Sequence, residues 1–137
     1  MASEEHQRLV NSLAKALETQ RSVTITHVDI DGTPEFFDDK YKDLETPEKH
    51  GNDGLTPDIQ GIKDGVIHLG EAEIDLNDEN VDSQLKTFSD LYVTKTGAIV
   101  PFHIVVPKQL EKDLYQKISD LGLNPKLKTG QLNVWTG

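Results

Sequence analysis

The stretch that decides the fold reads Thr56-Pro57-Asp58-Ile59-Gln60-Gly61-Ile62-Lys63-Asp64-Gly65-Val66-Ile67-His68-Leu69-Gly70-Glu71-Ala72-Glu73. Two short apolar runs flank Asp64-Gly65, a dipeptide that strongly favours a two-residue hairpin turn. Such a turn pairs Lys63 with Val66, so the numbers of directly paired residues sum to 129. We therefore expect two antiparallel strands, over Asp58–Ile62 and Val66–Leu76.

This register gathers three carboxylates at one end of the hairpin. Asp58 lies directly opposite Glu71, and such a pair shares a face with Cβ atoms about 4.5–5.5 Å apart. Glu73 is two residues further along and points to the same face. Because like charges placed opposite each other destabilise a sheet, a compensating cation is expected. A hard divalent cation with oxygen ligands would meet this need, as would Lys or Arg neighbours at a solvated strand end. A three-residue turn would shift the pairing by one.

Apolar periodicity predicts the other elements. Residues spaced at i, i+3 and i+4 predict helices over Ser3–Gln20, Asn80–Lys95 and Lys108–Leu121. Alternating or continuous apolar runs predict strands over Ser22–Ile30, Phe102–Val106 and Gln131–Trp135.

Two segments lack a clear period. Asp31-Gly32 predicts a turn, after which Pro34–Phe37 can pair back on the preceding strand. Residues 38–56 are charged and carry Pro47 and two glycines. A loop of this length inside a small domain is usually functional or disordered, and we expect a mobile loop here.

The order of elements predicts the fold class. It is an α-β-β-β-α-β core followed by a helix and a strand. The crossover from Val66 to Val106 should join parallel strands in a right-handed sense, whereas the turn-linked strands before it should be antiparallel. We therefore expect an α/β fold with a mixed β-sheet flanked by helices, in a single domain over residues 1–137.

Composition excludes several classes of protein. The 137 residues carry a net charge of −10 and no cysteine, which excludes disulfides and thiolate zinc sites. The N-terminus has no apolar signal core and no apolar run approaches about 18 residues, so we expect no membrane association and a cytoplasmic location. Residues 29–82 alone carry −13, which argues against a general DNA binder. The histidines show no metal-ligand spacing, and His68, on the strand face opposite Glu71, is expected to be structural.

Thr56-Pro57-Asp58, followed by a strand with Glu71-Ala72-Glu73, resembles the PD-(D/E)xK nuclease superfamily. This restriction-endonuclease-like fold includes Holliday-junction resolvases and many exonucleases. Its α-β-β-β-α-β core carries the Asp on the second strand and the tripeptide on the third. Gln84-Leu85-Lys86-Thr87-Phe88 is similar to the Q-h-x-x-Y motif of one exonuclease branch, with Phe88 in place of Tyr. The resemblance covers roughly Ser3–Val106.

The resemblance implies a role for each residue. Asp58 and Glu71 would bind Mg²⁺ or Mn²⁺ together with the backbone carbonyl of Ala72. Glu73 would act as a base or as a ligand of a second metal ion, and Gln84 would orient the site or contact substrate. The reaction would be phosphodiester hydrolysis, with metal-generated hydroxide, in DNA that includes branched or single-stranded forms. A domain this small has little room for a DNA cleft, so a homodimer or a larger complex is expected.

The chain departs from the family pattern at one position, because Glu73 stands where the family has Lys. Lys86 is a candidate for a migrated lysine, but residues i and i+2 do not share a helix face, so next to Gln84 it is expected at the surface. Glu5 could supply a first-helix carboxylate, although a role as partner of the helix dipole is favoured. The alternative function is a catalytically inactive domain of this fold that serves as a binding or assembly module. A third hypothesis is an unrelated α/β domain in which Asp58 is dispensable.

Overall fold

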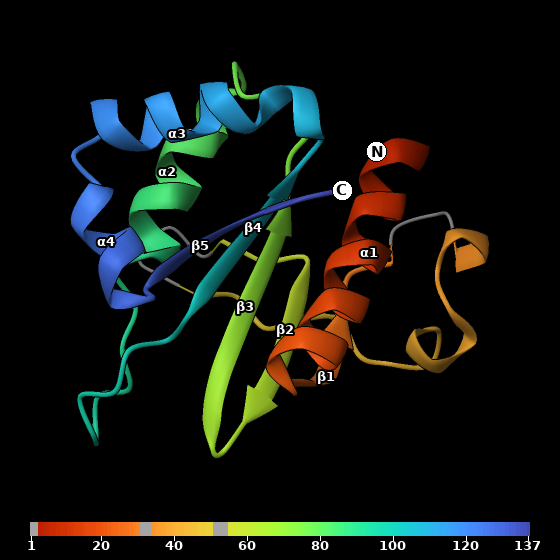
Figure 1. The fold of residues 1–137 in the computed structure, drawn as a ribbon. Coiled ribbons are helices and arrows are strands. Elements are labelled where there is room, and N and C mark those ends of the chain that lie inside the picture. The colour runs from red at the N-terminus through yellow and green to blue at the C-terminus, as the bar shows by residue number, and fades with distance from the viewer. Residues whose placement is uncertain (1–2, 31–33, 51–54) are drawn as a thin grey trace.

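A five-stranded sheet forms the centre of the computed structural model, which describes residues 3–30, 34–50 and 55–137 (Figure 1). Neighbours lie in the order β1-β2-β3-β4-β5. The β1–β2 and β2–β3 pairs are antiparallel, and the β3–β4 and β4–β5 pairs are parallel, so the predicted mixed sheet is confirmed. The strands are β1 (Thr24–Val28), β2 (Ile59–Lys63), β3 (Val66–Ala72), β4 (Phe102–Val106) and β5 (Leu132–Thr136).

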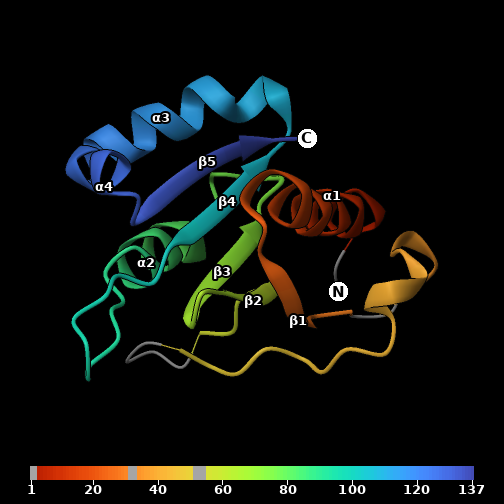
Figure 2. The ribbon, with the colours of Figure 1, turned by 60° about the horizontal axis from the view of Figure 1, so that its bottom comes forward.

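Helices cover both faces of the sheet, as Figures 1 and 2 show. One face packs against α1 (Glu4–Arg21), and the other packs against α2 (Glu79–Phe88) and α3 (Glu111–Asp120). A short helix that was not predicted, α4 (Asn124–Thr129), precedes β5. The α/β class and the predicted order of the main helices and strands are confirmed. No helix in the described residues combines the length and the apolar character that crossing a membrane requires.

The β2–β3 hairpin has the predicted turn and register. Asp64 and Gly65 both have positive φ angles, 52° and 81°, as a type I′ turn requires. Lys63 pairs with Val66 and Ile59 pairs with Gly70, which confirms the sum of 129. β3 ends at Ala72 rather than at the predicted Leu76, because the chain turns so that Leu76 packs beneath α2.

Helix α1 packs on the sheet over a glycine. The apolar face of α1 includes Leu13, which is buried together with Ile59 of β2 and Ala72 of β3. A Cβ atom on Gly70 would lie 3.0 Å from Cδ2 of Leu13, so a larger residue would force the Leu13 side chain to shift by a few tenths of an ångström. Ser3 caps α1 by accepting a hydrogen bond from the backbone N–H of His6 at 3.0 Å, which confirms the predicted helix start.

The predicted pairing of Pro34–Phe37 with the preceding strand is wrong, whereas the expectation of a mobile loop over residues 38–56 stays a prediction. Residues 34–36 form a 3₁₀ turn instead of pairing back on β1, and 39–41 form another. Phe37 and Tyr41 are buried against α1, and the N–H of Val28 donates to the carbonyl of Glu45 at 3.0 Å. Figure 2 shows this segment along the outer side of β1. Phe37 and Tyr41, four residues apart, therefore hold this charged segment against the core. The predicted Asp31-Gly32 turn and residues 51–54 lie outside the described residues.

Helix α2 stops at Phe88, short of the predicted Lys95. The hydroxyl of Ser89 donates to the carbonyl of Leu85, and the chain then reverses so that Tyr92 bridges to Ile99. Tyr92, which is spaced four residues from Phe88 and so continues the apolar period of the predicted helix, is 62% exposed. The apolar spacing in the sequence continues beyond Phe88, but the hydrogen bond of Ser89 ends the helix there.

The remaining predicted elements shift by a few residues. β1 is shorter than Ser22–Ile30, and a bulge between Ile25 and His27 turns Val28 toward the core instead of the opposite face. The last predicted helix begins as a 3₁₀ turn over 108–110 before α3. Gly122 ends α3 with a φ of 73°, as expected of a helix cap.

A hydrogen-bonded chain of three rings crosses the α1 face of the sheet. The indole N–H of Trp135 donates to Nδ1 of His103 at 3.0 Å, so the proton of a neutral His103 is on Nε2. That nitrogen lies 3.0 Å from Nδ1 of His68. Burial lowers the pKa of His103 to about 3, with a further contribution from the charges of His68 and Arg21. The contact of His68 with His103 fits the predicted structural role of His68.

We expect the buried His103 in this group of three rings to lower the free energy of unfolding in mild acid. The pKa of His103 is below its ordinary value of 6.5, so the unfolded state binds a proton that the folded state does not. This contribution to the free energy of unfolding is complete above pH 6.5 and is lost as pH falls toward 3. Between pH 7.5 and 5.0 the loss is about 2 kcal/mol.

Urea denaturation of the wild type, His103→Gln and His50→Gln at these two pH values checks this expectation. His103→Gln should lose less stability on acidification than the other two proteins. An equal loss in all three would contradict it.

Candidate active site

Two carboxylates meet where β2 begins and β3 ends. Asp58 directly precedes β2, and its N–H donates to the carbonyl of Gly70 at 2.9 Å and to Oε2 of Glu71 at 3.1 Å. Its own Oδ2 accepts from the N–H of Ala72 at 2.9 Å. The predicted pairing of Asp58 with Glu71 is therefore present, and backbone N–H groups hold both side chains in place.

Both of these acids are buried. Asp58 is 7% exposed and Glu71 is 5% exposed. Glu73 follows the end of β3, where its N–H donates to the carbonyl of Val105 at 3.0 Å, and its side chain is partly buried. Burying an ionised carboxylate is costly unless it is paired and hydrogen-bonded. The site therefore concentrates negative charge that few groups in the protein offset.

Gln84 reaches the site from α2, as its position in the motif implied. Its side-chain N–H donates to Oε1 of Glu71 at 3.3 Å, while its Oε1 is buried without a hydrogen-bond partner. Phe88 of the same motif is buried in the core, where its ring lies 5.1 Å from that of Phe102. Lys86 is exposed, which confirms the prediction that it belongs to the surface.

The residue that sequence reasoning missed is His6. Its Nε2 lies 3.1 Å from Oδ2 of Asp58, whereas Glu5, the acid considered on this helix, is exposed. His6, Val10 and Leu13 are spaced at i, i+4 and i+7, so the face of α1 that packs on the sheet also carries the imidazole. That spacing was the available signal for His6.

Burial and mutual repulsion raise the pKa values of the two glutamates. Burial raises the pKa of Glu71 well above its ordinary range, and the charges of Asp58 and Glu73 raise it further. Burial, and then the charge of Asp58, raises the pKa of Glu73 to about 7, although His6 opposes this shift. In a carboxylate cluster with enough positive charge nearby, the pKa values would instead be lowered.

The imidazole of His6 responds to the same charge. Burial alone would lower its pKa, but the hydrogen bond with Asp58, the charges of Asp58 and Glu73 and the backbone of Ala72 together raise it. A protonated His6 therefore supplies one positive charge to the carboxylates, less than their combined negative charge.

The donors fit a hard divalent cation in their chemistry. Carboxylates and a backbone carbonyl are the ligands that Mg²⁺ and Mn²⁺ prefer. Within the residues that the structure describes, however, no three Asp, Glu or His side chains are arranged to hold a metal ion. Oδ2 of Asp58 is instead engaged by His6 and the Ala72 N–H.

Comparisons of the chain with protein-family models, with curated proteins and with solved structures give no match. The assignment of a function to this site therefore depends on the residues and their geometry.

We expect Glu73→Gln to stabilise the protein at pH 8 in the presence of a chelator. Its pKa of about 7 exceeds the ordinary value of 4.5, so the folded state binds the proton more tightly than the unfolded state. The repulsion is complete above pH 7 and is relieved as pH falls toward 4.5. After allowance for solvent screening, the gain at pH 8 is about 2 kcal/mol in the free energy of unfolding.

Denaturation curves of the wild type and the variant from pH 8 to pH 4.5 measure this gain, which should shrink on acidification. Glu48→Gln, at an exposed position, is the control and should change little. A loss of stability in Glu73→Gln at pH 8 would show that the carboxylate is compensated.

Proposed function

We propose that the protein is a divalent-metal-dependent nuclease of the PD-(D/E)xK superfamily that hydrolyses phosphodiester bonds in DNA. One observation carries this proposal. Asp58 and Glu71 are buried opposite each other across the β2–β3 hairpin, and Glu73 follows at the end of β3. The α-β-β-β-α-β order of the elements supports the same family.

In this proposal, Asp58, Glu71 and the backbone carbonyl of Ala72 hold Mg²⁺ or Mn²⁺. The ion, when bound, supplies Lewis acidity and lowers the pKa of a bound water. Gln84 fixes the carboxylate of Glu71 through its hydrogen bond at 3.3 Å. The ion would also supply the positive charge that the three acids lack, so its binding should be accompanied by movement of His6 away from Asp58.

Glu73 takes the position of the family's lysine. A carboxylate there cannot stabilise a developing negative charge, but it can accept a proton from the attacking water. We assign Glu73 the role of general base. His6, at 3.1 Å from Asp58, is the partner of this carboxylate when no ion is bound.

A catalytically inactive domain that serves as a binding or assembly module is the second candidate. Two observations favour it: Glu73 replaces the lysine, and the described side chains do not converge on a preformed metal position. The two candidates differ in whether a bound metal ion leads to cleavage.

A cleavage assay tests the first candidate. Linear, single-stranded and branched DNA, together with RNA, are incubated with the wild type in Mg²⁺ or Mn²⁺. Asp58→Asn keeps the shape of the side chain and removes the charge that binds metal, so we expect at least a 100-fold loss of cleavage. Asp43→Asn, at an exposed position, is the control and should cleave normally. Equal cleavage by wild type and Asp58→Asn would refute the metal site.

Thermal denaturation with and without metal separates the two candidates from an unrelated fold. A ligand at 100 times its Kd stabilises the folded state by about 2.7 kcal/mol, so saturating Mg²⁺ or Mn²⁺ should raise the Tm of the wild type but not that of Asp58→Asn. Stabilisation without cleavage would favour the inactive module. If the metal ion produces neither stabilisation nor cleavage, Asp58 has no metal-binding role.

A further inference from the structure

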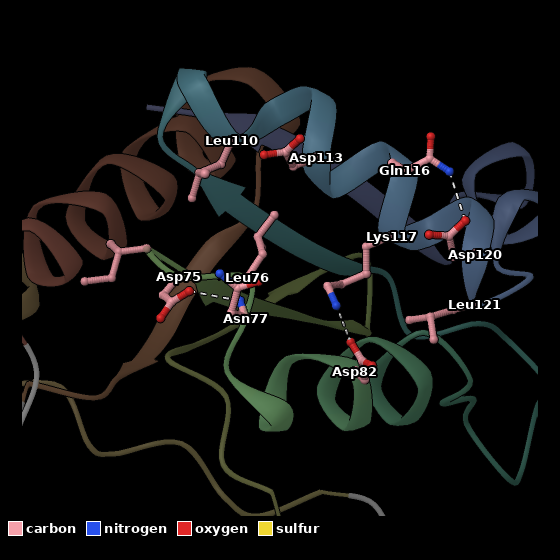
Figure 3. Close-up of a pocket in the computed structure, with 11 residues that line it drawn as sticks. Asp75, Leu76, Asn77, Asp82, Leu110, Asp113, Gln116, Lys117, Asp120 and Leu121 are labelled. Atoms are coloured by element: carbon pink, nitrogen blue, oxygen red, sulfur yellow. Dashed lines mark hydrogen bonds and ion pairs between the residues drawn. The ribbon is translucent and has the colours of Figure 1, made fainter.

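A hollow of about 520 Å³ lies beside the candidate active site (Figure 3). Its walls are the 74–77 turn, the first part of α2 and one face of α3. Ile74 and Asp75 directly follow Glu73 in the chain, and the charge of Asp75 acts on Glu73. The hollow therefore adjoins the carboxylates of the proposed site, although Asp58, Glu71 and Glu73 do not line it.

The hollow leaves apolar side chains in contact with water. Ile74 is 37% exposed, and the half-buried Leu110 and Leu121 contribute to the same lining. Polar residues line the same hollow, and Figure 3 shows Asp113 beside Leu110. An exposed apolar surface with a polar rim is typical of a protein-binding site.

The rim of the hollow is negatively charged. Asp75, Asp113 and Asp120 are exposed at its edge. Lys117 also lines the hollow, but it lies 2.7 Å from Asp82 and is paired with it. Because Lys117 is paired with Asp82, it does not offset the negative charge of the three exposed aspartates at the rim.

We propose that this hollow is a docking site for a basic amphipathic segment of a partner protein. Apolar side chains of the segment enter the hollow beside Ile74, and its Lys or Arg side chains pair with Asp113 and Asp120. A second copy of this chain fits poorly, because each copy carries a net charge of −10 and the two would repel each other. The acidic rim likewise repels the phosphates of DNA, so the hollow is assigned to a protein partner.

Fluorescence anisotropy with a synthetic probe tests this proposal. The probe is a labelled 14-residue peptide of leucine and lysine, with leucine at i, i+3, i+4 and i+7 so that a helix has one apolar face. We expect saturable binding that weakens as salt is added. A peptide with serine in place of every leucine should bind at least tenfold more weakly, because it has no side chain to fill the hollow.

Matched charge variants locate the site. D113N combined with D120N should weaken binding at least tenfold, whereas D43N combined with E48Q, which removes the same charge from exposed positions elsewhere, should change it less than twofold. Ile74→Ser should weaken binding at least fivefold. In an amide NMR titration, the peptide should shift resonances of residues 74–77 and of α3.

Several results would overturn the proposal. They are no binding of the leucine–lysine peptide, equal weakening by the two double variants, binding of the serine peptide as tightly as the leucine peptide, or amide shifts spread over the whole acidic surface. Asp58→Asn should bind the peptide like the wild type, so failure of the proposed nuclease activity would leave this inference standing.

Discussion

Two carboxylates face each other across the β2–β3 hairpin with little access to water, and much of the structure is arranged around them. Asp58 and Glu71 are each less than 10% exposed, and leaving such groups unpaired costs several kcal/mol. The protein offsets part of this cost with the Ala72 and Asp58 N–H groups and with Gln84. Burial first, and then the charge of Asp58, raises the pKa values of Glu71 and Glu73.

The two layers of helices deliver the polar partners of these acids. Helix α1 packs on β3 over Gly70, where an added Cβ atom would lie 3.0 Å from Cδ2 of Leu13, and His6 of this helix lies 3.1 Å from Asp58. Helix α2 packs on the other face through Val81, Leu85 and Phe88, which directs Gln84 toward Glu71. The site therefore depends on both hydrophobic cores, although its acidic side chains belong to neither.

A buried cluster that repels itself is unfavourable for stability, and its presence is easier to explain by function than by folding. Natural proteins often accept such a cost where a ligand or a reaction needs it. A divalent cation is the ligand that best matches these donors. The neighbouring hollow extends the same negative potential to Asp75, so a basic partner seated there would act on the electrostatic field of the site.

The sequence by itself determined the hairpin and the class of fold. Asp64-Gly65 specifies one turn geometry, and that turn fixes the pairing of every residue on β2 and β3, including Asp58 opposite Glu71. Such local constraints can be read from a sequence because they involve residues close together in the chain. The same holds for the alternating order of helices and strands, which predicted a mixed sheet with helices on both sides.

Only the tertiary structure decided which distant groups meet. His6 is 52 residues from Asp58, and its ring reaches the carboxylate because α1 packs on Gly70. The burial of Phe37 and Tyr41 and the end of α2 at Phe88 were likewise set by packing and by local hydrogen bonds that override periodicity. Lys117 of α3 likewise pairs with Asp82 of α2, 35 residues away in the chain. Contacts of this kind depend on the distances between whole elements, which a local pattern of residues does not encode.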